Sequence, residues 1–335
     1  MPKVSVLLPV FNGKDFIDDA IKSILNQTYS DLELLIIDDG STDETLKRIE
    51  AYNDSRIRLI SNGSNIGIAK SLNKGLNLIS SEYIVRMDCD DISLPTRIEK
   101  QVSFMDHNPR VGVCGTWMKT IGKLRTRYWK PPSGSDDIRC FFPFKNPLIH
   151  PSVILRREML LKYDLMYSEE FHHAEDLELW SRCARYFVLS NIKEVLVYYR
   201  IHNQSIGRLK RTLQKDSSNR VHKRELIRSG LLSVADCHEV LNWINNPLRE
   251  KKTPNRLNII EYWLHRLRDT NSRKRIYPER AFSRVLGWIW YRECLANRSL
   301  GIWTWRKFQR SSLNDLMSWE FKNQLELSIR CLIRK

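Results

Sequence analysis

The sequence predicts an α/β protein built on a mostly parallel β-sheet with helices on both faces. Four short apolar runs alternate with amphipathic segments that have helical spacing. These runs span residues 4–10, 32–37, 57–60 and 83–87. In such sheets, ligands bind outside the carboxyl ends of the strands. Three of the runs lead there into polar residues, so we expect Asn12, Asp39 and Asp88 to meet in one crevice.

The first two runs are each followed by turn and helix signals. A Phe11-Asn12-Gly13 turn precedes apolar residues at helical spacing between Ile17 and Leu25. The second run continues into Asp38-Asp39-Gly40-Ser41, where Ser41 and Glu44 have capping-box spacing for a further helix. Helices are also expected within residues 65–78 and 95–107, and a fifth strand over residues 111–115.

Beyond Gly115 the alternation weakens. Residues 125–145, rich in proline, predict a loop able to cover the crevice. Residues 175–183 predict a helix, and residues 195–199 a strand. From about Lys210 the pattern is helical, which places a domain boundary within residues 203–211. We therefore expect a catalytic-type domain over residues 1–207 and a mainly helical region over residues 208–335.

Charge is unevenly distributed along the chain. Lys and Arg total 55 against 39 Asp and Glu, a net charge of +16. Residues 1–207 are balanced, so the whole excess lies in residues 208–335, together with seven of the ten Trp. Three interpretations of this region stay open: association with an anionic membrane, a packed helical lobe with solvated charges, or nucleic-acid binding. Charge alone supports the third, and we expect no nucleic-acid partner.

Cysteine usage and hydropathy bear on location. Seven scattered Cys without a CxxC pair predict reduced thiols. No apolar run approaches the roughly 18 residues that span a bilayer, and the N-terminus enters a strand with no signal-peptide pattern. The expected location is cytoplasmic, with peripheral attachment to the inner face of the cytoplasmic membrane as the further expectation.

An acidic cluster follows the fourth apolar run. Asp88, Asp90 and Asp91 place three carboxylates within four residues at the end of a buried strand. Such carboxylates repel one another unless a cation lies between them, and hard oxygen ligands suit Mg²⁺ or Mn²⁺ bridging a diphosphate. The alternative is a solvated acidic turn that caps the next helix.

Six motifs in order carry a family resemblance. They are Val6-Leu-Leu-Pro9-Val-Phe11-Asn12, Ser23-Ile-Leu-Asn-Gln-Thr-Tyr29, Ile37-Asp-Asp39-Gly-Ser-Thr-Asp43, Asn65-Ile-Gly67 with Asn73, Asp88-Cys-Asp90-Asp91 with Pro95 and Arg97, and Glu175-Asp176. Over residues 3–205 the chain resembles the family 2 glycosyltransferases with the Rossmann-like GT-A fold, of the bacterial polysaccharide and O-antigen type. The resemblance implies an inverting enzyme that moves a sugar from a nucleotide-diphosphate donor to an acceptor hydroxyl. We expect the donor to be a UDP-sugar. Family habit and the basic C-terminal region, not the motif residues, lead us to expect a lipid-linked saccharide as the acceptor.

The resemblance also implies donor-binding residues. Phe11 is expected to stack on the base of the donor, and Asp39 to accept a hydrogen bond from a base edge. Pro9 and Asn12 belong to the same donor-binding motif, and Lys70 lies where the family often carries a basic residue near the nucleotide. Core packing, a turn cap and an exposed helix lysine are the alternatives for Phe11, Asp39 and Lys70.

The metal ligands follow from the acidic cluster and the last strand. Asp90 is the expected direct ligand, and Asp88 is expected to face the ribose or the metal. Asp91 is either a further ligand or a residue that orients the loop or caps the next helix. His202 is a candidate for another metal or phosphate contact, although a lone His is more often structural. Arg200 is a candidate phosphate contact.

Inversion requires a base that takes the proton of the acceptor hydroxyl. A carboxylate with a pKa raised by partial burial suits this role. Asp176 is the expected base because the family uses the Asp of a Glu-Asp pair here, with Glu175 and then Glu178 as substitutes. The alternative is that these acidic residues only stabilise a helix N-terminus.

Two other functions compete with the transferase. A sugar-nucleotide nucleotidyltransferase would carry a Gly-rich phosphate loop with a Lys after the first strand, whereas this chain has Pro9-Val-Phe-Asn-Gly13. A non-catalytic carbohydrate-binding or scaffold protein of the same fold is the other. Intact Asp90 and Asp176 argue against it.

Overall fold

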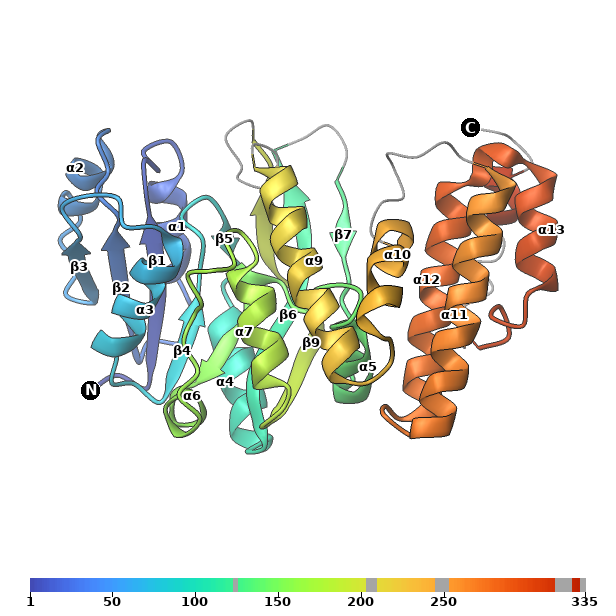
Figure 1. Ribbon diagram of the computed structural model, residues 1–335. Coiled ribbons are helices and arrows are strands. Elements are labelled where there is room, and N and C mark those ends of the chain that lie inside the picture. Colours follow the sequence, from blue (N-terminus) through green and yellow to red (C-terminus); the bar gives the residue numbers. More distant parts are fainter. Residues whose placement is uncertain (123–125, 203–209, 245–252, 317–326, 332–335) are drawn as a thin grey trace. The chain divides into compact units, whose positions relative to one another are not determined.

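The computed structural model describes residues 1–122, 126–202, 210–244, 253–316 and 327–331 (Figure 1). The chain forms two compact units. Unit 1 comprises Met1–Ile138 and Asn146–Ser218, and unit 2 comprises Arg139–Lys145 and Asn219–Lys335. The boundary expected at residue 207 falls on residues 203–209, outside the described part. The division between the units comes later, after Ser218, and a short earlier segment also belongs to unit 2.

Unit 1 contains a nine-stranded mixed sheet in the order β3-β2-β1-β4-β8-β6-β9-β5, with β7 paired to β6. The strands are β1 (Val4–Val10), β2 (Leu32–Asp38), β3 (Ile57–Ser61), β4 (Tyr83–Arg86), β5 (Ile92–Ser93), β6 (Val111–Ile121), β7 (Tyr128–Trp129), β8 (Ile154–Arg156) and β9 (Val188–Arg200). The first four are parallel, which confirms the predicted α/β class. The sheet becomes mixed because β8 runs antiparallel to both β4 and β6.

Helices cover both faces of the sheet. The helices up to residue 183 are α1 (Ile17–Leu25), α2 (Thr45–Glu50), α3 (Ile68–Leu78), α4 (Arg97–His107), α5 (Ser135–Phe141), η1 (His150–Ser152), α6 (Arg157–Lys162) and α7 (Glu175–Cys183). Alternate residues of β1 point to opposite faces. Val6 therefore packs with the apolar residues of α1 and α4, while Leu7 lies against Gly75 of α3.

The predicted capping box before α2 is wrong. The side chain of Asp43 lies at the start of this helix, where its Oδ1 accepts a hydrogen bond from the Thr45 N–H at 3.0 Å. The Ser41 hydroxyl instead accepts a hydrogen bond from the Asn12 N–H at 2.9 Å. Ser41 therefore ties the loop after β1 to the loop after β2.

The segment expected to be a loop, residues 125–145, contains β7 and α5 instead. The predicted strand over residues 111–115 also continues, to Ile121, and its later half pairs with β7 on one side and with β9 on the other. The parallel register with β6 runs to the pair Ile121 and Arg200. The end of this long β9 brings Arg200, and His202 just beyond the strand, to the acidic cluster.

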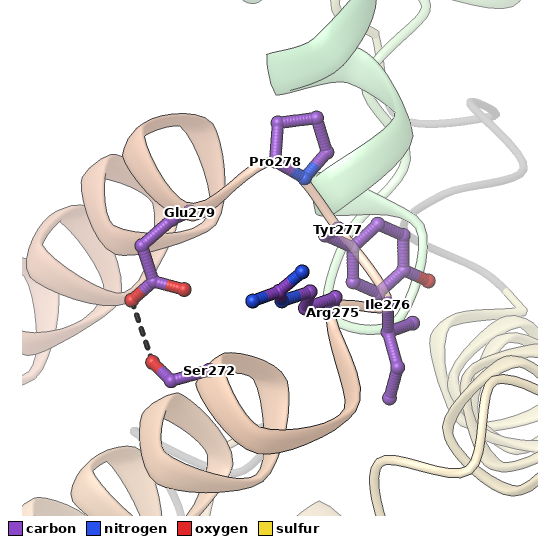
Figure 2. A pocket seen from close by; sticks show the side chains of 6 residues that line it. All are labelled: Ser272, Arg275, Ile276, Tyr277, Pro278 and Glu279. Carbon is purple, nitrogen blue, oxygen red and sulfur yellow. Dashed lines mark hydrogen bonds between the residues drawn. The ribbon is translucent and has the colours of Figure 1, made fainter.

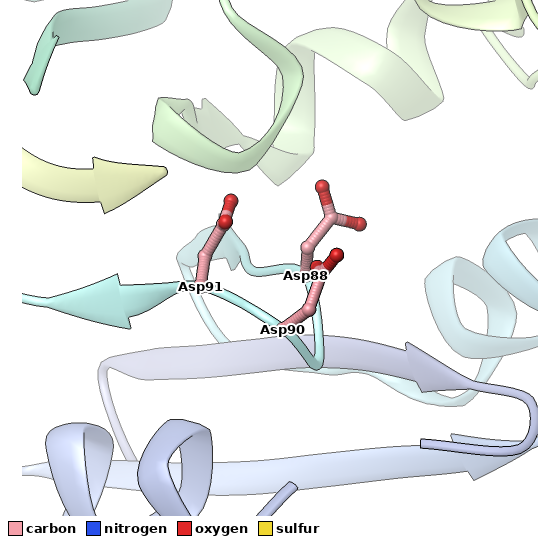
Figure 3. Close-up of side chains that lie close together, drawn as sticks. All are labelled: Asp88, Asp90 and Asp91. Carbon is pink, nitrogen blue, oxygen red and sulfur yellow. The ribbon is translucent and has the colours of Figure 1, made fainter. Parts of the chain in front are cut away.

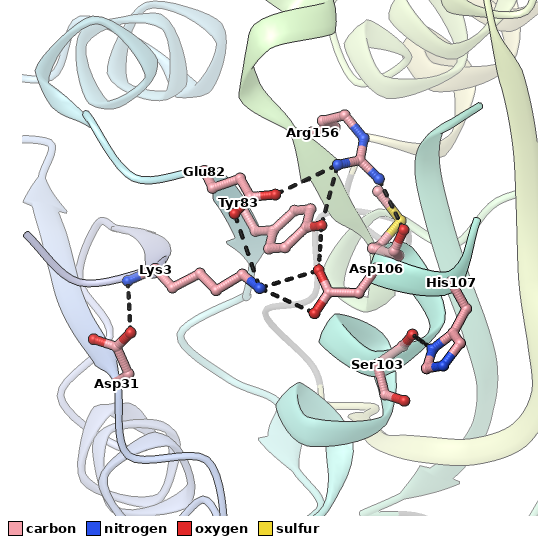
Figure 4. Close-up of polar contacts among 9 residues, drawn as sticks. Lys3, Asp31, Glu82, Tyr83, Ser103, Asp106, His107 and Arg156 are labelled. Carbon is pink, nitrogen blue, oxygen red and sulfur yellow. Dashed lines mark hydrogen bonds and ion pairs between the residues drawn. The ribbon is translucent and has the colours of Figure 1, made fainter. Parts of the chain in front are cut away.

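A polar network fixes the amino ends of β1 and β4 (Figure 4). The buried Tyr83 donates a hydrogen bond to Asp106 at 2.7 Å, and the Lys3 ammonium contacts the same carboxylate at 2.9 Å. Arg156 donates to the Tyr83 hydroxyl at 3.1 Å and to the Met105 carbonyl at 2.8 Å. The network holds the C-terminal end of α4 at the edge of the sheet where β4 begins.

Unit 2 is helical and has its own core. Helix α9 (Arg211–Arg228) leads from unit 1 into unit 2, and it is followed by α10 (Val234–Ile244), α11 (Pro254–Lys274), α12 (Glu279–Ala296), η2 (Arg298–Leu300) and α13 (Ile302–Arg310). The core combines residues of these helices with Cys140, Phe141 and Phe144. Helix α11 begins at a Thr253 cap followed by Pro254, a favoured start.

The Trp residues of unit 2 bear on the three interpretations of this region. Trp290 and Trp263 are buried in the core, and Trp288, Trp303 and Trp305 are partly buried against it. Trp290 and Trp263 therefore stabilise the helical unit and are not available to an interface with lipid. This supports the interpretation as a packed helical unit.

The turn between α11 and α12 borders a pocket (Figure 2). Arg275 adopts the left-handed conformation there, with φ 53°. The Asn271 side chain holds the turn by donating to the Tyr277 carbonyl at 3.1 Å and accepting from the Tyr277 N–H at 2.8 Å.

Among the residues that the structure describes, no helix is long and apolar enough to cross a membrane.

Candidate active site

Three carboxylates converge at the end of β4 (Figure 3). Asp88, Asp90 and Asp91 each present an oxygen, and these oxygens lie within 4.8 Å of one another. Asp91 is fully buried, and its Oδ2 has no hydrogen-bond partner. Burial and the neighbouring carboxylates raise the pKa of Asp91 well above its ordinary range. A buried, unpartnered oxygen among hard oxygen donors fits a divalent cation such as Mn²⁺ or Mg²⁺.

The end of β9 contacts the acidic cluster through both backbone and side chains. The Arg200 N–H donates to Asp91 Oδ1 at 2.8 Å, and Arg200 Nε donates to the Asp90 carbonyl at 2.9 Å. Nε2 of His202 lies 2.8 Å from Oδ2 of Asp90. Phe16 packs beside both side chains, with its ring 4.5 Å from that of His202 and 5.1 Å from the Arg200 guanidinium. The four predicted metal-binding residues are thus brought together.

Arg86 is a site residue that the sequence analysis missed. Its Nη1 lies 2.5 Å from Oδ1 of Asp88, and its side chain is almost fully buried. Below it, the buried Arg97 donates to the Arg86 carbonyl at 2.9 Å. Burial removes much of the hydration of a cation, which is unfavourable. The negative charges of the surrounding carboxylates offset this loss and stabilise Arg86 in its buried position. It places a permanent positive charge beside the first Asp of the cluster.

Asp39 is buried at the end of β2 and organises the loop before α3. Its carboxylate accepts four hydrogen bonds of 2.9–3.0 Å, from the Asn62 amide, the Ile66 N–H, the Gly67 N–H and the Ser71 hydroxyl. Three of them go to Oδ1, so Oδ2 accepts from the Gly67 N–H alone. Asp39 is therefore a loop anchor whose second oxygen retains capacity to accept a hydrogen bond.

The loop after β1 carries the other predicted donor-binding residues. Asn12 adopts a left-handed conformation, φ 52°, and its Oδ1 accepts from the Thr42 N–H at 2.8 Å. This geometry leaves the Phe11 side chain 45% exposed. Pro9 is buried within β1, two residues before Phe11. Lys70 is half-exposed on α3 and forms an ion pair with Glu169 at 3.4 Å.

The acidic pair at the start of α7 consists of a buried Glu175 and a partly buried Asp176. Burial raises the pKa of Asp176, and this effect outweighs the hydrogen bond from the Leu177 N–H and the nearby Arg86 cation, which both lower it. Oδ2 of Asp176 accepts from the Asn146 amide at 2.8 Å, and its Oδ1 accepts from the Leu177 N–H at 2.7 Å. Glu175 is 8% exposed, its Oε2 has no partner, and burial together with Asp176 raises its pKa to about 7. These are the environments expected of a proton-accepting group.

Glu178 is the weakest of the three carboxylates as a base. Both of its oxygens accept hydrogen bonds from Arg182, at 2.8–3.0 Å. An ion pair of this kind holds a carboxylate in its charged form and occupies its lone pairs. Glu178 therefore stabilises α7.

The segment that leads into α7 is tied to α3. The Asn73 amide donates to the Tyr167 carbonyl at 2.9 Å and accepts from the Tyr167 N–H at 2.9 Å. The Tyr167 hydroxyl is 3.0 Å from Nε2 of His150, and both rings pack edge-on to Trp180 of α7. The start of α7 is thereby fixed from two sides.

Comparison with known proteins agrees with this arrangement. The model of the family "Glycosyl transferase family 2" matches residues 5–164. An uncharacterized glycosyltransferase of Haemophilus influenzae is 35% identical over 256 residues, which cover 73% of this chain and 79% of that protein. The O-antigen biosynthesis glycosyltransferase WbnJ of Escherichia coli is 35% identical over 212 residues, 60% of this chain and 81% of WbnJ. The chain belongs to glycosyltransferase family 2.

Solved structures show the same fold. S. aureus TarS, residues 1–349 in complex with UDP-GlcNAc, superposes with a TM-score of 0.59 at 19% identity, covering 98% of this chain and 90% of TarS. The mannosyltransferase PcManGT from Pyrobaculum calidifontis, in complex with GDP-Man and Mn²⁺, gives a TM-score of 0.54 at 16% identity, covering 98% and 86%. The family 2 glycosyltransferase thus has the predicted GT-A fold with a helical C-terminal part, and it is an enzyme.

Two of the three residues that the sequence analysis missed had recognisable signals. Arg86 is a charged residue inside an otherwise apolar strand, two positions before Asp88. Asn73 belongs to a family motif but had no assigned role. Asn146 gave no signal beyond its place before a proline, because its partner Asp176 is distant in sequence.

Proposed function

We propose that this glycosyltransferase is an inverting enzyme that transfers a sugar from a UDP-sugar to a hydroxyl of a lipid-linked saccharide in cell-surface polysaccharide synthesis. The observation that carries the proposal is the pairing of two acidic sites. One is the cluster at the end of β4, and the other is the pair formed by the buried Glu175 and the partly buried Asp176. This pair lies close enough to Asp88 for that carboxylate to affect the pKa of Glu175.

The donor nucleotide is proposed to bind along the ends of β1 and β2. The exposed ring of Phe11 offers a flat surface for the base, and Oδ2 of Asp39 can accept an N–H of a uracil edge. Pro9 and Asn12 shape the loop that holds Phe11. Lys70 would contact the diphosphate after its ion pair with Glu169 breaks. Breaking this pair costs little free energy because ion pairs on the surface are weak.

A divalent cation would be held by Asp90 and Asp91, with Asp88 facing the metal or the ribose and His202 as a further ligand or a support for Asp90. Such an ion, when bound, neutralises the charge that grows on the departing diphosphate. The Arg200 N–H fixes Asp91, and Arg86 fixes Asp88. PcManGT contains Mn²⁺ in its complex, which supports Mn²⁺ or Mg²⁺ here.

Asp176 is proposed as the base, with Glu175 as the substitute. A raised pKa brings a carboxylate closer to the operating pH, where general-base catalysis is most effective. Asn146 and the Leu177 N–H orient the Asp176 carboxylate, so one oxygen lone pair can be directed at the acceptor hydroxyl.

The acceptor and the location are inferred from the relatives and from charge. WbnJ is named for O-antigen biosynthesis, which supports a polysaccharide acceptor. The positive excess of residues 208–335 supports a peripheral position on an anionic inner membrane surface, where a lipid-linked acceptor would be met.

The deciding experiment is a hydrolysis screen of UDP-sugars and GDP-sugars with the intact protein and Mn²⁺. We expect slow hydrolysis of one UDP-sugar that stops in excess EDTA. Preference for a GDP-sugar would overturn the donor assignment. Binding of saccharides without hydrolysis or transfer from any donor would favour the non-catalytic alternative.

A further inference from the structure

The short strand β7 exposes two aromatic side chains beside the candidate active site. Tyr128 is 58% exposed and Trp129 is 42% exposed. The Trp129 indole stacks on the ring of Tyr199, with centroids 5.3 Å apart and planes inclined by 28°. The next residue, Arg200, contacts both Asp90 and Asp91. The stack therefore begins next to the acidic cluster.

Trp129 and Tyr128 point to opposite faces of the sheet, since side chains alternate along a strand. Trp129 is in register with Met118 of β6, and Tyr199 with Thr120, two residues further along the same face. Tyr128 is in register with Lys119 and has the Lys130 ammonium 5.9 Å from its ring. Of the two aromatic residues of β7, Trp129 is the one that lies on the same face of the sheet as Tyr199.

Tyr199 connects the exposed indole to the carboxylates. Burial and the charges of Asp88, Asp91 and Asp90 raise the pKa of its phenol, so its hydroxyl end lies in their field. Its ring meanwhile supports one face of Trp129. The indole is thus held in a fixed orientation with part of its surface open to a ligand, which lowers the entropy lost on binding.

We propose that Trp129 is a stacking platform for a pyranose ring of the acceptor, and that Tyr199 positions it; this inference rests on the proposed transferase function. A pyranose has an apolar face of C–H groups and a polar rim of hydroxyls. A flat, half-exposed indole complements that face, while the rim remains free for hydrogen bonds.

The position of β7 in the sheet favours the acceptor over the donor base as the occupant. Phe11 and Asp39, proposed for the base, follow β1 and β2. In the strand order, β4 separates β1 and β2 from β8, β6 and β9. β7 pairs with β6 beyond the acidic cluster that follows β4. A saccharide on Trp129 would therefore approach the cluster from the side opposite to the nucleotide.

The test is a binding titration of the intact protein, saturated with UDP and Mg²⁺. Binding of each probe is measured by saturation-transfer NMR. The probes are methyl β-glycosides of glucose, galactose and N-acetylglucosamine, methyl α-mannoside, and glycerol as a probe without a ring. We expect at least one pyranoside to bind and glycerol not to bind. Trp129→Ala should weaken that binding about tenfold, and Trp129→Phe should restore most of it. Tyr128→Ala, the matched exposed aromatic of the opposite face, should bind as the unchanged protein does.

UDP affinity, measured on the same variants, separates this inference from the proposed function. If UDP binds and no pyranoside does, or if Tyr128→Ala loses as much as Trp129→Ala, the platform is refuted while the transferase proposal stands. If pyranosides bind through Trp129 but UDP and Mg²⁺ do not bind, the platform stands and the transferase proposal falls. Binding to liposomes is measured on the unchanged protein and on Trp129→Ala. If Trp129→Ala loses liposome binding and neither of these two proteins binds a pyranoside, the indole contacts lipid and the platform is refuted.

Discussion

The amide of Asn73 exchanges two hydrogen bonds of 2.9 Å with the backbone of Tyr167. Asn73 lies on α3, which follows the loop anchored by Asp39, and Tyr167 lies in the segment that leads to the start of α7. One side chain therefore joins the nucleotide-facing part of the enzyme to the part that carries the proposed base. Asn73 contacts no reacting group in this arrangement, so its role is to position others.

Asn73→Ala should lower kcat while leaving UDP affinity nearly unchanged. Each lost hydrogen bond costs about 1 kcal/mol, enough to loosen the segment before Asp176 without unfolding the domain. Steady-state kinetics together with UDP titration would separate the two effects. Asn77→Ala, an exposed position on the same helix, is the control and should behave as the unchanged protein. Equal losses of kcat and UDP affinity would contradict a positioning role.

Asp90 and His202 should differ in their effect on metal affinity. Asp90→Ala should abolish measurable Mn²⁺ binding and transfer while the fold is retained, because a direct carboxylate ligand is lost. His202→Ala should weaken Mn²⁺ binding about 10–100-fold if its role is to hold Asp90. Calorimetric titration with Mn²⁺ would measure both, with Asp136→Asn, an exposed carboxylate on α5, as the control. Full transfer in excess EDTA would refute metal dependence.

Asp176→Asn should reduce turnover by about 10²-fold or more, because the amide keeps the shape of the side chain but cannot accept a proton. UDP affinity should change little. Asp164→Asn is a suitable control, since Asp164 is exposed and Asn tolerates its left-handed backbone, φ 49°. If Glu175→Gln were inactive and Asp176→Asn active, the roles of the two residues would have to be exchanged.

Glu175 should make the metal-free protein less stable as the pH rises through about 7. Burial and Asp176 raise its folded-state pKa above the ordinary value of about 4.3, so the protonated form is favoured by folding. The stability that it contributes is complete below the ordinary pKa and is lost as the pH rises through the folded-state pKa. Melting temperatures from pH 5.5 to pH 9 in EDTA should therefore fall less for Glu175→Gln than for the unchanged protein. Glu158→Gln, at an exposed position of α6, should match the unchanged protein. Parallel profiles for all three would contradict this assignment.

Binding to membranes should be electrostatic. Trp263 and Trp290 are buried in the core of unit 2 and cannot anchor it to lipid. We therefore expect attraction between basic residues and anionic lipid to dominate, on the order of 1 kcal/mol for each residue near the surface. Sedimentation with liposomes should show binding to anionic vesicles that weakens steeply with salt, and slight binding to neutral vesicles. Equal partition onto both kinds of vesicle would exclude the electrostatic mechanism, and no partition onto either would leave unit 2 as a packed helical unit alone.

The alternation of apolar runs with amphipathic segments was sufficient to predict the parallel half of the sheet, because its inner strands β1, β2 and β4 are almost wholly buried. It failed for β7, which has two residues, both exposed, and therefore no buried pattern to detect. The acidic cluster was predictable because strand ends converge in this fold class. The roles of Arg86 and Asn146 were not predictable. Asn146 meets Asp176, which is 30 residues away in the sequence, and local spacing does not show that the buried side chain of Arg86 turns toward Asp88.

The seven residues Arg139–Lys145 leave the ribosome long before the rest of unit 2. They carry Cys140, Phe141 and Phe144, whose apolar surface is buried only when helices from residues 219–335 have formed. At a synthesis rate of about 5–20 residues per second, this surface stays uncovered for seconds in the nascent chain. Ending the gene at residue 207, or expressing the first unit by itself, would make that exposure permanent. The chain is therefore expected to require chaperone protection during translation and to tolerate neither a single cut between its units nor the exchange of its C-terminal part as an independent module.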